Sequence, residues 1–276
     1  MTGSKTFPMI SYARPDLAEL EVGFRRLITD FSHADSSAAQ IVIMKELTRL
    51  RNQAETMATL VSIRHSLDTR DAFYDSENNF MDELMPHYEG LLSEFYHALH
   101  ASPFQEDLAT AFGRHLFDLV EVKLKTFKPI VLEDLQIENK LCSEYVKLLA
   151  SAKIVFEGEE RNLSQMGPFM QSTDRDMRVR SQMAVTGFFA EHECEFDRIY
   201  DDLVRIRTLI AKKLGFDNFV ELGYARMNRT DYDAVAVKSY RDQVLHSVVP
   251  VARKLRERQA RRLQLESLKY LSLIHI

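Results

Sequence analysis

Residues 192–196, with the sequence His-Glu-Cys-Glu-Phe, come closest in this chain to the helical zinc motif His-Glu-x-x-His. That motif needs two histidines four positions apart, which hold the metal from one helix face, and a glutamate beside the first histidine as a base. Phe196 stands where the second histidine would be, and His192 lies four residues from both Phe188 and Phe196. We therefore expect His192 to pack at a helix edge, and neither it nor Glu193 is assigned to a metal site.

Glu94 and His97, followed by His100, have the spacing of the Glu-x-x-His ligand pair of di-iron helical bundles. Residues three positions apart project from one helix face, but the chemistry needs the pair twice. No other histidine in the chain has a glutamate three positions before it. A solvated or packed helix is the favoured interpretation, and a di-metal bundle built on Glu94 and His97 is the weaker alternative.

Two groups of charged residues could bind ions. The segment from Arg253 to Arg262 is basic, but it contains no aromatic residue and is interrupted by Glu257 and Gln259. We expect it to be the outward face of an amphipathic helix rather than a phosphate-binding surface. The acidic group lacks the spacing and central glycine of a calcium loop, which favours helix-start and surface roles for Asp75, Glu77, Asp82 and Glu83.

Other catalytic signatures are missing from the sequence. No two glycines are closer than eight positions, which excludes the glycine-rich loops that bind phosphate groups. The chain has no Gly-x-Ser-x-Gly motif, and neither Cys142 nor Cys194 lies in a recognisable nucleophile signature. The residues alone therefore predict no catalytic, no cofactor-binding and no metal-binding side chain.

The composition predicts the elements that would carry any site. Of 276 residues, 45% are hydrophobic, and nine glycines and seven prolines are too few for a sandwich or barrel, which favours long helices. A net charge of −5 gives no field that attracts nucleic acid. No apolar run approaches the ~18 residues of a membrane span, and residues 1–15 lack the apolar core of a secretory signal. Two cysteines are too few for a disulfide framework and fit a reducing cytoplasm.

Apolar residues at helical spacing predict four or five helices up to residue 127. The first is expected to have Pro15 in its first turn, and the second runs from Ser36 to about Leu67 as its antiparallel partner. Further helices cover residues 71–100 and 103–127, with interruptions at Pro86 and at residues 101–103, and one more covers 129–150. We assign residues 1–150 to an N-terminal helical lobe.

The spacing of apolar residues changes from helical to hairpin-like after residue 150. Residues 153–163 carry the only hairpin signal, a β-branched and aromatic triplet followed by Glu157-Gly158. Apolar steps from residue 173 to 214 then predict one helix of about ten turns, ended by Gly215. A short helix over 219–227, a cap at Asp231 and a final amphipathic helix with its stripe at residues 244–263 follow. We assign residues 151–270 to a second region, and residues 271–276 to a non-native tail.

Several segments resemble the oligoendopeptidase F branch of the thimet-oligopeptidase-like zinc metallopeptidases. The resemblance covers the chain up to Tyr270 and is most specific in residues 225–232, ARMNRTDY. The other matching segments are residues 214–219, 249–251 and 255–259, the hairpin region 156–160 with 163–165, and the helical layout from Tyr12 to Ala150.

The resemblance implies a mainly helical, two-lobed metallopeptidase scaffold with one small hairpin, which encloses a deep channel where short peptides are cleaved. In that family the zinc motif and a downstream glutamate ligand lie beyond the segment that Tyr270 ends. The chain is therefore expected to be an N-terminal, channel-forming fragment of a cytoplasmic zinc-dependent oligoendopeptidase. It would be inactive alone and bind no cofactor, whereas the longer parent would take zinc and an oligopeptide substrate. No catalytic or metal-binding residue is carried over.

A stand-alone helical interaction module without enzymatic activity is the alternative. It predicts a folded chain with no exposed apolar face. The fragment hypothesis predicts the reverse, because helices meant to pack against a missing lobe leave apolar side chains open to solvent.

Overall fold

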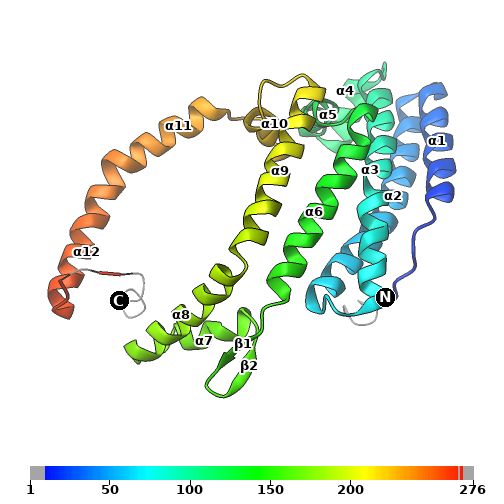
Figure 1. Ribbon diagram of the computed structural model, residues 1–276. Helices are drawn as coiled ribbons and strands as arrows, with labels where there is room; N and C mark the ends of the chain where they lie inside the picture. The colour runs from blue at the N-terminus through cyan, green and yellow to red at the C-terminus, as the bar shows by residue number, and fades with distance from the viewer. Residues whose placement is uncertain (1–9, 267, 270–276) are drawn as a thin grey trace, which may run out of the picture. The chain divides into compact units, whose positions relative to one another are not determined.

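The computed structural model describes residues 10–266 and 268–269, and the predicted tail at 271–276 lies outside them. The described chain is mainly helical with one hairpin, which confirms the predicted fold class (Figure 1). The α-helices are α1 (Leu17–His33), α2 (Ser37–Leu67), α3 (Ala72–His100), α4 (Gln105–Phe112), α5 (His115–Thr126), α6 (Leu132–Ala150), α7 (Gly167–Met170), α8 (Arg175–Glu191), α9 (Glu193–Leu214), α10 (Phe219–Arg226), α11 (Ala234–Gln243) and α12 (Val249–Leu263). The short turns are η2 (Pro129–Val131), η3 (Ser164–Met166) and the π-helical η4 (Val244–Val248), and the strands are β1 (Ile154–Phe156) and β2 (Glu159–Arg161).

The chain divides into two compact units. The first is formed by the described residues up to Val146 together with Ile199–Thr230, and the second by Lys147–Arg198 together with the described residues from Asp231 onward. The first unit thus combines the N-terminal helices with the second part of α9 and with α10.

The core of the first unit begins with α1, α2 and α3, which pack against one another side by side (Figure 1). Their starts follow the sequence closely, because Asp16, Ser36 and Asp71 each cap a helix through the side-chain oxygen. Pro15 consequently precedes α1 instead of opening it. The core centres on Phe24 and Phe31 of α1, which are fully buried and meet Tyr88 and Phe95 of α3 edge to face.

A second core in the same unit joins α6, α9 and α10. It contains Val131 from η2, Leu135 from α6, Ile210 from α9 and Leu222 from α10. These residues come from distant parts of the sequence, so this core places Arg207 and Arg226 beside α6.

Pro86 lies inside α3 and does not interrupt it, so the predicted break there is wrong. A proline lacks the N–H that would bond the carbonyl four residues earlier. That carbonyl belongs to Asp82, and the Asn139 side chain of α6 donates to it at 3.2 Å. The neighbouring Glu83 carbonyl accepts from the Gln136 side chain at 2.9 Å. A second helix therefore supplies donors where the proline removes one.

Two other helix boundaries differ from the prediction. Residues 103–127 form two helices, because Gly113 adopts φ 92° and separates α4 from α5. The cap of α11 is Asp233 and not Asp231, since the Asp233 carboxylate accepts from the Ala236 N–H at 2.8 Å.

The second unit contains the hairpin in the predicted place. Ile154 pairs with Arg161 and Phe156 with Glu159, and the turn residues Glu157 and Gly158 have φ values of 51° and 80°. Ile154 and Phe156 pack with Val185 and Phe188 of α8 in a third core. The predicted helix of about ten turns is wrong, because the chain leaves helical geometry at His192 between α8 and α9. Glu193 and Glu195 then lie in the first turn of α9, where acidic side chains are favourable.

The segment α11–η4–α12 has no buried residue in its described part. The predicted amphipathic helix forms, with a π-helical turn inside it, but its apolar stripe is not covered. Val248, Val251 and Leu255 expose 55%, 56% and 57% of their surface. An amphipathic helix normally buries such a stripe against a partner.

Gly215 ends α9 as predicted, with φ 94°. Its N–H donates to the Lys212 carbonyl, and the Phe216 N–H donates to the Ala211 carbonyl at 2.9 Å. We expect Gly215→Ala to lower the free energy of unfolding by about 1 kcal/mol, because a Cβ disfavours this backbone region. Denaturant unfolding followed by circular dichroism measures it. The matched control is Gly187→Ala inside α8, where a Cβ meets no atom within 4 Å and should stabilise the helix. A loss of similar size in both variants would contradict this explanation.

Candidate functional site

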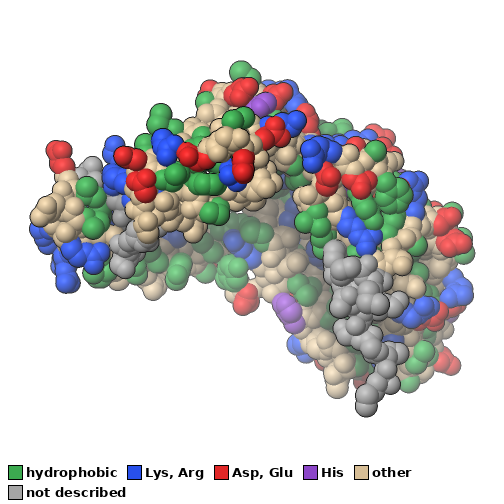
Figure 2. Space-filling model, turned by 90° about the horizontal axis from the view of Figure 1, so that it is seen from below, with side chains coloured by type: hydrophobic (Ala, Val, Ile, Leu, Met, Phe, Trp, Pro, Cys, Tyr) green, Lys and Arg blue, Asp and Glu red, His purple; other side chains and the backbone are tan. Residues whose placement is uncertain are grey.

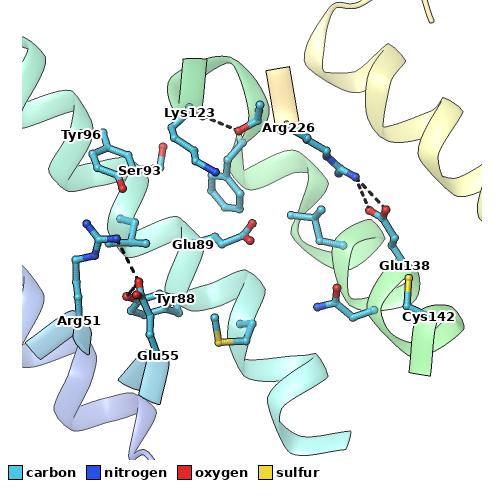
Figure 3. Close-up of a pocket in the computed structure, with 16 residues that line it drawn as sticks. Arg51, Glu55, Tyr88, Glu89, Ser93, Tyr96, Lys123, Glu138, Cys142 and Arg226 are labelled. Atoms are coloured by element: carbon cyan, nitrogen blue, oxygen red, sulfur yellow. Dashed lines mark hydrogen bonds and ion pairs between the residues drawn. The ribbon is translucent and has the colours of Figure 1, made fainter. Parts of the chain in front are cut away.

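A pocket of about 470 Å³ opens within the first unit, lined by residues of α2, α3, α5, α6 and α10 (Figure 3). Its volume lies in the range of small-molecule and cofactor sites. Part of the wall is apolar, with Met85, Leu92, Phe127 and Leu135 among the lining residues. The charged lining comes from all five helices, so only the folded unit assembles it.

Glu55 of α2 is held by two donors on one side of the pocket. The Arg51 guanidinium contacts its carboxylate at 3.2 Å, and the Tyr88 hydroxyl donates to the same oxygen at 2.8 Å. Burial, followed by the hydrogen bond to Glu55, raises the pKa of Tyr88. Tyr88 therefore stays a neutral donor, and Glu55 has no role left as a free base.

Glu138 of α6 is held on the other side of the pocket. Its side chain is buried, and its carboxylate accepts from Arg207 of α9 at 2.7 Å and from Arg226 of α10 at 2.9 Å. Lys213 and Asp134 make a second bridge between α9 and α6 at 2.6 Å. These ion pairs fix α9 and α10 on α6 and turn the Arg226 side chain toward the pocket (Figure 3).

Glu89 of α3 lies between these two groups, and its carboxylate points into the pocket (Figure 3). It has no hydrogen bond or ion pair to any described residue. The carboxylate is reached by solvent, yet protein surrounds the pocket, and this desolvation raises the pKa of Glu89. Lys123 and Arg226 act in the opposite direction, and Glu138 adds to the rise.

The raised pKa of Glu89 predicts a pH-dependent effect on stability. A carboxyl whose pKa is higher in the folded than in the unfolded chain favours the fold at low pH, and this contribution is lost as the pH rises through the folded value. We therefore expect Glu89→Gln to raise the melting temperature at pH 7. The difference should shrink as the pH falls through the raised pKa of Glu89 in the folded chain, and it should be gone below the ordinary glutamate value. The gain should be at most about 1 kcal/mol, because water reaches the carboxylate.

Melting curves of both proteins between pH 4 and pH 8 measure this effect. Glu121→Gln, which replaces an exposed glutamate of α5 outside the pocket lining, is the control and should leave the curves unchanged. A Glu89→Gln variant that is less stable than the parent at neutral pH would show that the charge of Glu89 supports the fold.

The sequence candidates lie elsewhere. His192 is in the second unit, where its Nδ1 lies 2.9 Å from a Glu195 carboxylate oxygen and its ring lies 4.8 Å from that of Phe188. This is the predicted position at a helix edge. Glu94 accepts from Arg25 at 2.7 Å, so its carboxylate serves an ion pair on the surface of α3. His97 and His100 are exposed.

The four acidic residues do not form one cluster. Each bonds to a different partner: Asp75 to His65, Glu77 to Arg14, Asp82 to Ser143, and Glu83 to Lys140. Glu77 departs from the expected surface role, because it is 3% exposed. Its hydrogen bonds from Arg14 and Tyr12 lower its pKa. In the basic segment, Arg253, Lys254, Arg256 and Arg258 of α12 are exposed. On the face that Figure 2 shows, acidic and basic side chains are mixed over most of the surface.

The residues predicted from the sequence did not include Glu89, Lys123 or Glu138. A signal for Glu89 existed, because Met85 and Leu92 at helical spacing place it on an apolar stripe. Arg226 lies in the segment 225–232 where the family resemblance is most specific. The partners of Glu138 are 69 and 88 residues away, so local patterns carry no trace of them.

No group of three or more His, Cys, Asp or Glu side chains in the described ranges could hold a metal ion. The described residues therefore do not fit a zinc site. In the same part of the chain, no helix is long and apolar enough to cross a membrane.

The chain matches one family model and several solved structures of known proteins. Residues 7–127 match the family model of the Peptidase M3 N-terminal domain. A 3.1 Å X-ray structure of a protein assigned as oligoendopeptidase F matches 98% of this chain at 50% identity, with a TM-score of 0.94. An assigned oligoendopeptidase F from Bacillus anthracis str. Ames is 48% identical over 99%, also with a TM-score of 0.94. PZ peptidase A with an inhibitor is 51% identical over 97%, with a TM-score of 0.93.

A search of curated proteins found no match. The chain spans about half the length of the solved structures it matches. It covers 48% of the protein in the 3.1 Å structure, 48% of PZ peptidase A and 50% of the Bacillus anthracis protein. The helical layout, the hairpin and the alignment over nearly the whole chain at about half identity agree with the predicted resemblance. The chain belongs to the oligoendopeptidase F group of the M3 peptidases and corresponds to their N-terminal region.

Proposed function

We propose that this chain is the peptide-binding, channel-forming part of an oligoendopeptidase that hydrolyses short peptides. The observation that carries the proposal is the near-complete match, at about half identity, to solved oligoendopeptidase F structures and to an inhibitor-bound PZ peptidase. The pocket around Glu89 supports it, since a charged, partly apolar cavity suits short peptides.

Zinc is the metal proposed for a longer parent protein, on the family resemblance. Because the described residues do not fit a metal site, no step of hydrolysis is assigned to them. We further propose that the chain by itself is inactive, and that it resides in the cytoplasm, where Cys142 and Cys194 can both remain free thiols.

The exposed apolar side chains of α11–η4–α12 favour this proposal over a stand-alone interaction module. The module predicted no exposed apolar face. A dye that fluoresces on apolar surface should bind the 276-residue chain more strongly than it binds a helical protein of similar size. Dye binding at the level of that reference protein would favour the module.

The direct experiment is hydrolysis of a quenched fluorescent oligopeptide with added zinc. It compares the 276-residue chain with a chain extended through the natural reading frame past Tyr270. We expect activity in the extended chain alone, and its loss on chelation. Activity of the shorter chain that a chelator removes would place an active site within these residues. No activity in a folded extended chain would contradict the peptidase proposal.

A further inference from the structure

The pocket around Glu89 contains cationic side chains with hydrogen-bond donors that no described residue accepts. The Nε atom of Arg51 and the Nη2 atom of Arg226 are buried and have no hydrogen-bond partner among the described residues. Lys123 lines the same pocket, and no described residue bonds to its ammonium group. These three cations come from α2, α10 and α5, so they surround the pocket instead of lying along one helix (Figure 3).

Two of the three carboxylates that line the pocket already have partners. Glu55 already accepts from Arg51 and Tyr88, and Glu138 already accepts from Arg207 and Arg226. Glu89 is the one lining carboxylate without a bonded partner in the described ranges. A buried donor without an acceptor costs free energy, and a ligand that supplies acceptors recovers it.

We propose that this pocket binds the free α-carboxylate at the C-terminal end of a short peptide, with Lys123, Arg226 and Arg51 as its donors. A carboxylate is acceptor-only, and its hydrogen bonds to cationic donors are stronger than those between neutral groups. The inference rests on the proposed function, because that proposal supplies peptides as the ligand class. The apolar lining residues Leu92, Phe127 and Leu135 would contact the side chain of the terminal residue.

Glu89 sets the condition for this binding. Its negative charge opposes a second carboxylate in the same pocket, whereas protonated Glu89 can donate a hydrogen bond to it. The charged groups around Glu89 are Arg51 and Glu55 of α2, Lys123 of α5, Glu138 of α6 and Arg226 of α10. With Glu89 neutral, the cations of the pocket are in excess. Binding of the carboxylate should therefore strengthen as the pH falls.

The test is calorimetric titration of the 276-residue chain with three forms of one tetrapeptide. The first is N-acetylated with a free carboxylate, the second is N-acetylated with a C-terminal amide, and the third has a free amine and a C-terminal amide. We expect the free acid to bind about tenfold more tightly than either amide, the factor that one charge-assisted hydrogen bond contributes. Equal binding of the three forms, or binding of none, would overturn the proposal.

Two substitutions predict changes of opposite sign. Lys123→Met should weaken binding of the free acid about tenfold and leave the amides unchanged, whereas Glu89→Gln should strengthen binding of the free acid at neutral pH. Lys125→Met, which changes an exposed lysine of the same helix outside the pocket, is the control and should have no effect. Circular dichroism verifies that each variant is folded. A loss on Glu89→Gln together with preference for the free-amine peptide would identify an ammonium ligand instead.

This result is separable from the peptidase assay. Hydrolysis by the extended chain with no preference for the free acid would remove the carboxylate site and leave the proposed function in place. Binding of the free acid by a chain whose extended form hydrolyses nothing would remove the proposed function and leave the carboxylate site in place.

Discussion

Glu138→Ala is expected to lower the free energy of unfolding by about 3 kcal/mol, because removing one partner of a buried ion pair leaves the other charge uncompensated. Here two charges lose their partner, Arg207 and Arg226. Their side chains are 34% and 24% exposed, so water reaches them in part and keeps the cost from being larger. Urea unfolding followed by circular dichroism at pH 7 measures the change.

The control is Glu133→Ala, which removes an exposed glutamate from the first turn of the same helix. Its cost should stay below about 1 kcal/mol, the effect of one charge at a helix end. Glu138→Gln, which keeps the size and an oxygen acceptor, should fall between the two. If Glu138→Ala costs no more than Glu133→Ala, the ion pairs do not hold α9 and α10 on α6.

Phe24→Ala is expected to cost about 4 kcal/mol, the usual loss for a fully buried phenylalanine. Phe24 of α1 is 0% exposed and faces α3, where its ring meets the Tyr88 ring at a centroid distance of 5.7 Å. The substitution removes this edge-to-face contact and leaves a cavity in the largest core. The expected result is a lower urea midpoint with an unchanged slope.

Val22→Ala on the same helix is the matched control, since Val22 is 70% exposed. It should change the stability by no more than about 0.5 kcal/mol. A Phe24→Ala variant as stable as this control would show that α1 is not part of the cooperative core.

Much of the fold could be predicted because its signals are local. Ser36 and Asp71 cap α2 and α3 because their side-chain oxygens accept hydrogen bonds from the first turn. Gly215 ends α9 because a residue without a side chain adopts a positive φ easily. The hairpin followed from three β-branched or aromatic residues before Glu157-Gly158. Each of these features depends on neighbours in the sequence, and so did the expectation that His192 packs against Phe188.

The features that escaped prediction depend on distant residues. Helix α3 passes through Pro86 because side chains of α6 bond to the carbonyls of Asp82 and Glu83. No proline or glycine lies next to His192, so the sequence carries no signal for the break between α8 and α9. The pocket around Glu89 needs five helices, and its charges become meaningful only when α5, α6 and α10 are in place.

The proline inside α3 also has a consequence for the order in which the chain folds. Without α6, the Asp82 carbonyl, which the Pro86 nitrogen cannot bond, would have only water as a partner, so α3 would be weakest at this point. Docking of α6 supplies Gln136 and Asn139 as donors at this point, so completion of α3 and placement of α6 become one cooperative event. The proline thus makes the secondary structure of one helix depend on the tertiary position of another.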